Sequence, residues 1–419
     1  MKSLVTELNE ANRLKHLLSH IKVLDLSRVL AGPWSGQMFA DLGAEVIKVE
    51  RPGVGDDTRA WGPPFLKDAK GENSKESGYY LGVNRGKKSI TVDISKPEGQ
   101  EIIKTLAKDV DIILENYKVG TLARYQLDYE SIKKINEKII YCSITGFGQT
   151  GPKANNLAYD FLIQAMGGLM SVTGEKDQNP GGGPQKVGIP IIDLITGSYA
   201  TIGVLAALAH REVSGQGEYI DMSMLDVQVG LLSNQAMNYL MSGKVPTRGG
   251  NAHPNIQPQD VFKCSDGQVV LAVGNDGQFT SLCAAMGLSQ LSQDERFKTN
   301  AQRVKNQAEL RPILDGAFIK ETRAYWTEKM EQADVPCGPI NSVAEALNDP
   351  QIQHRQMVRN LEHPVSGVVP QVMTPFHFKN ASIKVDSAPP LLGQHTLKIL
   401  QDMGLSDHQI HELREKGVI

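Results

Sequence analysis

The amino-acid sequence predicts an α/β protein with a large parallel sheet and a second, smaller domain. The chain has 419 residues, of which 40% are hydrophobic, and chains of this size usually form two or more domains. Strand-like and helix-like segments alternate over roughly the first 150 residues, which is typical of a parallel sheet with helices on its faces. Near residue 224 this alternation stops, and a linker rich in Gly, Pro and Asn follows Gly243.

The expected elements of the first half follow one another closely. Strands are predicted at 21–27, 45–50, 89–94, 111–116 and 139–146, and helical patterns separate them. One helix opens at Pro97, where the missing N–H of proline is not needed.

The second half has a different pattern. A helical segment runs from Met224 to Gly243, and a β-hairpin follows the linker, with Asp266 and Gly267 as its turn. Two further helical segments extend to about residue 332. We therefore predict four parts: an N-terminal extension at 1–20, the first part of a large Rossmann-like domain at 21–224, a small inserted α+β domain at 225–330, and a return to the large domain at 331–419.

Composition excludes several classes of function. The net charge is -3, so no overall field attracts the protein to nucleic acid or to an anionic membrane. The four cysteines form no CxxC pair and no zinc spacing, which favours free thiols in a reducing cytoplasm and no metal site. The N-terminus lacks the apolar core of a signal peptide, and we expect no membrane span because no apolar run reaches about 18 residues.

One carboxylate stands out in an otherwise apolar stretch. In "VGIPIIDLITGSYATIGVLAALAHRE" the apolar run Ile189–Ile192, interpreted as a strand, stops at Asp193, and a segment rich in small residues follows. Asp193 could be a helix N-cap, worth about 1 kcal/mol, or a functional group at the strand end where such sheets bind ligands. Asp160 precedes another apolar helix and has the same two interpretations.

Three cationic or loop segments are also candidates. "GVNRGKKS" is either a phosphate loop or a solvated basic turn; it does not match the Walker A spacing. Arg51 follows the second strand, where an arginine favours a phosphorylated ribose, and the 3′-phosphate of coenzyme A fits at least as well as a 2′-phosphate. A surface arginine in a loop is the alternative interpretation. His253 lies in a Gly-rich loop without a partner motif, so an ordinary loop histidine is the simpler interpretation.

Taken together, several motifs resemble the family III CoA-transferases, the CaiB/BaiF group. The resemblance runs from about residue 20 onward. It is carried, in order, by "VLDLSRVLAGPWSGQMFADLGAEVIKVERPGVGDDTR", "NRGKKSITVDISKPEG", "LENYKVGTLAR", "SITGFGQTGP", "YDFLIQAMGGLMSVTG", "GIPIIDLITG" and "LLGQHT".

The resemblance implies a fold, a partner and a set of site residues. It implies a Rossmann-like domain built from both chain ends, an interlocked homodimer, acyl-CoA and a carboxylic acid as substrates, and no permanently bound cofactor. Asp193 takes the position of the nucleophilic aspartate. The positions similar to CoA contacts are Leu30, Ala31, Arg51, Val92, Asp93, Ile94, Ser95, Asn116, Tyr117, Lys118, Arg124, Leu157, Ala158, Tyr159 and Asp160.

Departures from the family pattern argue against two activities, CoA transfer to oxalate and racemisation of 2-methylacyl-CoA. Oxalate enzymes carry a glycine run after "RGGNA", but here the run is His253-Pro254-Asn255-Ile256, which cannot adopt Gly-only conformations. The racemase branch has a basic His where this chain has Tyr159, a poor base at neutral pH. Similarity to the glutarate-type members favours succinyl-CoA as donor and a dicarboxylate as acceptor. A 2-methylacyl-CoA racemase and a non-catalytic CoA-binding protein are the alternatives.

The implied chemistry needs a carboxylate that can hold an acyl group. We expect Asp193 to attack the donor thioester and form an anhydride, with oxyanion donors at the start of the following helix or in "RGGNAHPN". Positive potential at the helix end should lower the pKa of Asp193. Water must be excluded, and the candidate lid contains Gly249, Gly250, Asn251, His253 and Gln257.

Overall fold

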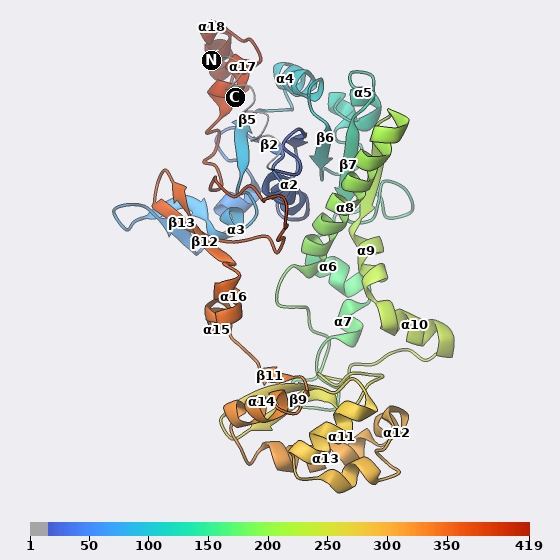
Figure 1. Ribbon diagram of the computed structural model, residues 1–419. Helices are drawn as coiled ribbons and strands as arrows, with labels where there is room; N and C mark the ends of the chain where they lie inside the picture. Colours follow the sequence, from blue (N-terminus) through green and yellow to red (C-terminus); the bar gives the residue numbers. More distant parts are fainter. Residues whose placement is uncertain (1–15) are drawn as a thin grey trace. The chain divides into compact units, whose positions relative to one another are not determined.

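The computed structural model describes residues 16–419, so most of the expected extension at 1–20 lies outside the described residues (Figure 1). Contacts divide the chain into two compact units. The large unit contains the described residues up to Gly167, together with Gly188–Ser233 and Gln351–Ile419. The small unit contains Gly168–Val187 and Asn234–Pro350, whereas the sequence placed the smaller domain at 225–330.

The large unit contains a six-stranded parallel sheet in the order β5-β2-β1-β6-β7-β8. The strands are β1 (Lys22–Asp25), β2 (Glu45–Glu50), β5 (Lys87–Thr91), β6 (Ile112–Glu115), β7 (Ile140–Thr145) and β8 (Glu218–Ser223). Numbered within the sheet, this order is 3-2-1-4-5-6, as in doubly wound nucleotide-binding sheets. The chain reverses direction across the sheet between β1 and β6, and ligands bind such sheets at the carboxyl edge beside that point.

Two apolar cores cover the two faces of the sheet. On one face, Phe39, Ala200 and Val204 pack with the strands, which places helices α2 (Ala31–Asp41) and α8 (Ile191–Ser214) there. On the other face lie α4 (Pro97–Ala107), α5 (Tyr129–Lys133), α17 (Thr396–Asp402) and α18 (Asp407–Glu415). Helix α8 approaches α2 so closely that a Cβ on Gly197 would come 2.3 Å from the carbonyl oxygen of Ala31.

Helix α8 differs from the sequence expectation in two ways. The strand predicted at Ile189–Ile192 is wrong: α8 begins at Ile191, and Asp193 lies in its first turn. Periodicity does not separate so short an apolar run from the start of a buried helix. Helix α8, with 24 residues, is also long and apolar enough to cross a membrane by length and composition alone, which was not expected. In the structure one side of α8 packs on α2, β7 and β8.

The large unit also contains shorter elements outside the six-stranded sheet. Strand β5 starts and ends earlier than predicted, which leaves Val92, Asp93 and Ile94 in the loop after it. The other elements are η1 (Asp57–Ala60), β3 (Phe65–Lys67), β4 (Asn73–Ser77), α3 (Gly78–Leu81), η2 (Ala123–Tyr125), α6 (Asp160–Met166), α9 (Met224–Leu231), β12 (Val358–His363) and β13 (Gly367–Val372), with α16 (Pro350–His354) at the junction of the units.

The small unit has its own sheet and core. Strands β9 (Gln259–Cys264), β10 (Gly267–Ala272) and β11 (Cys337–Pro339) form an antiparallel sheet, and Phe262, Phe318 and Trp326 lie in the core. The hairpin is confirmed, but Cys264 pairs with Gly267, so its turn residues are Ser265 and Asp266. The helical elements are α7 (Leu169–Val172), α10 (Ser233–Ser242), α11 (Asp276–Ala285), η3 (Ser289–Gln293), α12 (Asn300–Lys305), α13 (Gln307–Phe318), α14 (Arg323–Glu331) and α15 (Val343–Asn348).

The single helix predicted from Met224 to Gly243 is two helices. Helix α9 ends at Leu231, and Ser233, with φ of 43°, begins α10. A non-glycine residue in the left-handed region interrupts the regular helical backbone there, so the apolar pattern continues through a break that composition does not mark.

Residues near 418 return to the sheet beside β5. The N–H of Asp93 donates to the carbonyl of Val418 at 2.7 Å, and the N–H of Thr91 donates to Oγ1 of Thr396 at 2.9 Å. These bonds tie the loop at 92–95 to a segment about 300 residues away in sequence.

Candidate functional site

Two adjoining cavities lie at the carboxyl edge of the large sheet. The first, about 540 Å³, contains Asp193 on its wall, and the second, about 390 Å³, contains Arg51. Both are lined by Arg28, Asp57 and Tyr117, so they adjoin at these residues, and we refer to the two cavities together as the groove. The groove begins where β1 and β6 end, at the reversal point of the sheet.

Most residues with a predicted contact to CoA line this groove. The first cavity has on its wall Leu30, Ala31, Asn116, Tyr117, Lys118, Leu157, Ala158 and Tyr159. The second has Arg51, Val92, Asp93, Ile94, Ser95 and again Tyr117. Two predicted residues are on neither wall: Arg124, which donates to Thr121, and Asp160.

Asp193 lies half-buried in the first turn of α8. Burial, and after it the charge of Asp160, raise the pKa of Asp193 to about 7. The predicted lowering of this pKa by the helix end is therefore wrong. Burial is the larger cause, and in addition the carboxylate of a second aspartate occupies the helix end.

That carboxylate belongs to Asp160, the first residue of α6. Its Oδ2 accepts the N–H of Ile192 at 2.7 Å and the N–H of Asp193 at 3.1 Å. The N–H of Leu194 donates to the carbonyl of Pro190 at 3.2 Å. The oxyanion donors predicted at the start of this helix are thus already engaged.

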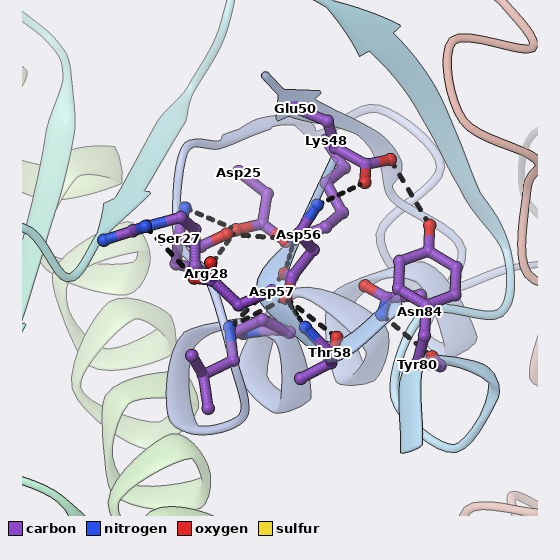
Figure 2. Close-up of polar contacts among 12 residues, drawn as sticks. Asp25, Ser27, Arg28, Lys48, Glu50, Asp56, Asp57, Thr58, Tyr80 and Asn84 are labelled. Atoms are coloured by element: carbon purple, nitrogen blue, oxygen red, sulfur yellow. Dashed lines mark hydrogen bonds and ion pairs between the residues drawn. The ribbon is translucent and has the colours of Figure 1, made fainter. Parts of the chain in front are cut away.

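A network of buried ion pairs supports the loop between β1 and α2 (Figure 2). Lys48 on β2 is fully buried, pairs with Asp56 at 2.8 Å and donates to the carbonyl of Ser27 at 2.9 Å. Both carboxylate oxygens of Asp56 lie 3.3 Å from the N–H of Val29, which has φ of 71°. These contacts hold the backbone just before Leu30 in a left-handed turn.

The cations of "GVNRGKKS" belong largely to the same buried framework. Lys87 pairs with Asp25 at 2.9 Å with both side chains fully buried, and Arg85 pairs with Asp41 at 2.6 Å. Burial lowers the pKa of Lys87 to about 8, against the opposing charge of Asp25. The phosphate-loop interpretation is wrong for Arg85 and Lys87, because neither is available to an anion.

Glu50, at the end of β2, is likewise engaged within the protein. Its carboxylate accepts two bonds from Arg59, at 2.7 and 2.8 Å, and one from Ser89 at 2.7 Å. Arg59 also contacts Glu76. Glu50 and the next residue, Arg51, both line the second cavity, and Arg51 is the cation of the two.

Arg28, which was not predicted as a site residue, lines both cavities. Its N–H donates to Asn116 at 2.8 Å, its carbonyl accepts from the same amide, and its guanidinium lies 5.3 Å from the ring centroid of Tyr117. It also pairs with Asp57 at 3.1 Å. Its position directly after β1, at the edge where ligands bind, was the available signal.

The candidate lid residues belong to the small unit. Gly249, Gly250 and Asn251 line a cavity of about 500 Å³ together with Arg311. Gln257 is buried and donates to the carbonyl of His253 at 2.8 Å. Among residues 16–419, no group of three or more His, Cys, Asp or Glu side chains is arranged to hold a metal ion.

Comparison with known proteins identifies the family of this chain. The sequence profile of CoA-transferase family III matches residues 18–396. A succinate–glutarate CoA-transferase of Agrobacterium fabrum is 48% identical over 92% of this chain and 95% of its own length. The human succinyl-CoA:glutarate CoA-transferase is 43% identical over 98% and 91%, respectively.

Solved structures point the same way. A CaiB/BaiF family protein from Brucella suis is 46% identical, covers 93% of this chain and 100% of its own, and superimposes with a TM-score of 0.82. A hypothetical protein from Mycobacterium tuberculosis is 28% identical, with a TM-score of 0.79 over 91% of this chain and 98% of its own. The chain therefore belongs to CoA-transferase family III and is a CoA-transferase.

Proposed function

We propose that this enzyme moves CoA from succinyl-CoA to a dicarboxylate acceptor, with Asp193 as the nucleophile. The observation that carries the proposal is the place of Asp193 on the wall of a groove whose far end holds Arg51 and the loop at 92–95. The names of the relatives from Agrobacterium fabrum and human support the donor and the acceptor class.

The transfer consists of two symmetric halves. A carboxylate oxygen of Asp193 attacks the succinyl carbonyl and expels CoA thiolate, which leaves a mixed anhydride. The thiolate then attacks the Asp193 carbonyl and expels succinate, which forms an aspartyl-CoA thioester. The acceptor carboxylate attacks this thioester and expels the thiolate again. Finally, the thiolate attacks the acceptor carbonyl, which releases acceptor-CoA and free Asp193.

Each part of the groove has a distinct role in this proposal. Arg51 and the loop at 92–95 hold the phosphorylated adenosine end of CoA, since a guanidinium suits a phosphate. Leu30, Ala31 and Tyr159 enclose the thioester beside Asp193 and limit access of water to the anhydride. The segment Gly249–Gln257 of the small unit serves as the lid.

We further propose that the enzyme is an interlocked homodimer in the cytoplasm. In the large unit, α6, α8 and α9 contact one another and expose Phe161, Ile202 and Val229, which are 51–60% accessible. In the small unit, α10 buries no residue and exposes Leu240 and Met241. Large apolar surfaces of this kind are usually covered by a second chain.

A panel of donors and acceptors tests the function. The protein is incubated with succinyl-CoA and a series of mono- and dicarboxylic acids, and new CoA esters are identified by mass spectrometry. We expect dicarboxylate-CoA and free succinate from the wild type, and neither from Asp193→Ala or Asp193→Asn. Transfer at the wild-type rate by either variant would exclude Asp193 as the nucleophile, and transfer to monocarboxylates alone would exclude the acceptor class.

A further inference from the structure

We propose that Asp160 is a positioning residue that favours the acylated state of Asp193, by holding the first turn of α8 and by placing a second negative charge beside the nucleophile. The inference rests on the proposed role of Asp193. Asp160 reaches no cavity wall, so its contribution acts through Asp193 and not through contact with CoA.

The geometry of Asp160 is that of a helix cap supplied from another helix. Pro190, at the N-cap position of α8, makes no side-chain cap bond. Asp160 supplies it, since one oxygen accepts the N–H groups of Ile192 and Asp193 and the other accepts from Gln164. Asp160 is 7% exposed, and Gln164 is fully buried. The backbone of the nucleophile is therefore fixed by a buried carboxylate 33 residues away in sequence.

Among the ionisable groups around Asp193, Asp160 is the acid whose charge raises the pKa of Asp193. On the cavity wall lie Arg28, Asp57, Tyr117, Lys118 and Tyr159. The pKa of Tyr79 on α3 is raised by burial and then by the charges of Asp193 and Asp160. The elements that pack on α8 also carry Asp41 on α2, Tyr141 and Cys142 on β7, Glu218, Tyr219 and Asp221 on β8, and Asp226 on α9. Beyond burial, the charge that raises the pKa of Asp193 is that of Asp160.

This arrangement changes one equilibrium of the reaction. Free Asp193 is a half-buried anion beside another anion, whereas the aspartyl-CoA thioester is neutral there. In the exchange of succinyl-CoA and Asp193 carboxylate for aspartyl-CoA thioester and succinate, one C–S bond and one C–O bond break and one of each forms. One oxygen atom and the negative charge of the Asp193 carboxylate move to succinate. Because succinate carries that charge in water, Asp160 shifts the exchange toward the thioester.

The experiment measures this exchange directly. Enzyme is mixed with fixed concentrations of succinyl-CoA and succinate without acceptor, and intact-protein mass spectrometry gives the ratio of aspartyl-CoA enzyme to free enzyme. For Asp160→Asn we expect that ratio to fall about tenfold, the change that corresponds to one pKa unit. We expect the acid limb of the kcat/KM profile of the same variant to move to lower pH.

Two further variants separate charge from folding. Asp111→Asn is the matched control: Asp111 also accepts a backbone N–H, from Lys22 at 2.8 Å, and pairs with Arg211 in the last turn of α8, roughly 27 Å along the helix from Asp193. Gln164→Met keeps the charge of Asp160 and removes one of its donors. We expect wild-type ratios and pH profiles for both variants, and the Gln164 variant identifies any loss that is due to packing.

The outcomes distinguish the two proposals. If Asp193→Asn still forms the thioester or transfers CoA, the nucleophile assignment fails. If Asp193→Asn is inactive but Asp160→Asn keeps the wild-type ratio and pH profile, the role of Asp160 is overturned while the proposed function stands. An equal fall of the ratio in Asp160→Asn and Gln164→Met would also overturn it, because packing would then account for the effect.

Discussion

Buried charge is handled in opposite ways at two places along the same sheet edge. Beneath the loop between β1 and α2, each buried carboxylate has a cation: Asp56 faces Lys48, and Asp25 faces Lys87. Burial pushes the pKa of both aspartates up, but the lysines outweigh it and hold the pKa values below the ordinary one. At the start of α8, Asp193 has a second carboxylate beside it, and its pKa rises to about 7.

The contrast separates structural charge from reactive charge. A buried ion pair with its hydrogen bonds satisfied fixes the backbone in one position, and its removal leaves an unpaired charge. A buried carboxylate without a cation gains stability when it loses its charge, either to a proton or to an acyl group. The paired groups hold the groove, and the unpaired one is suited to chemistry within it.

The largest expected effect tests the reactive side of the contrast. Asp193→Asn keeps the shape of the side chain but removes the nucleophilic oxygen anion, so we expect CoA transfer to fall by about a thousandfold or more. A coupled assay of succinate release measures it. Asp56→Asn, in which the substitution removes a paired carboxylate, should reduce activity in proportion to its loss of folded protein. Comparable specific activity of the two variants would contradict the assignment of a reactive role to Asp193 and a structural role to Asp56.

The second prediction tests the structural side. Lys48→Met leaves Asp56 buried without its cation, and breaking one partner of a buried pair typically costs about 3–5 kcal/mol. The matched control is Lys88→Met, since Lys88 pairs with Glu45 at 2.6 Å on the surface, where pairs contribute about 0–1 kcal/mol. Denaturant unfolding gives both free energies. Equal losses for the two lysines would show that burial does not set the difference.

A third prediction links Asp193 to pH-dependent stability. Its pKa is raised on folding, so its contribution to stability is fully present below the unfolded value near 4 and is lost as pH rises toward 7. Above this pH the ionised Asp193 destabilises the folded protein, and Asp193→Asn removes that destabilisation. We expect the variant to be more stable than wild type by about 2 kcal/mol at pH 8, after allowance for solvent screening, and by less at pH 5. Thermal unfolding at the two pH values measures it, and a gain that is larger at pH 5 would contradict the assignment.

The smallest expected effect concerns the loop that the paired charges hold. Val29 is β-branched and has φ of 71°, a conformation that costs of order 1 kcal/mol or more for such a residue. Val29→Gly relieves that strain but adds freedom to the unfolded chain. We expect a change in unfolding free energy within about 1 kcal/mol of zero, together with a weaker apparent affinity for CoA. A loss of stability of several kcal/mol would show that the Val29 side chain, and not the network, holds the loop.

The sequence predicted those features that depend on neighbouring residues. The strand at 45–50, the helix that opens at Pro97 and the hairpin near residue 266 were recognisable from local pattern and turn chemistry. The start of α8 was not, because four apolar residues before an acid fit a strand end as well as a helix start.

Features that depend on distant partners could not be read from the sequence. Lys87 meets Asp25, 62 residues away, and this pairing turns an apparent phosphate loop into a buried support. The pKa of Asp193 depends on Asp160 in the same way. A single sequence contains both partners of each pair but does not show that they are close in space. The predicted lowering of the Asp193 pKa therefore took only the helix end into account.

The bond between Asp93 and Val418 has a consequence for protein synthesis. The segment at 92–96 leaves the ribosome long before its partners, since Gly417, which accepts from Lys96, is translated 321 residues later. At typical elongation rates of about 5–20 residues per second, this wall of the groove waits tens of seconds for its support. A nascent chain can therefore form the central strands early, but the wall that we propose binds the adenosine end of CoA cannot be completed until residues near 418 have emerged.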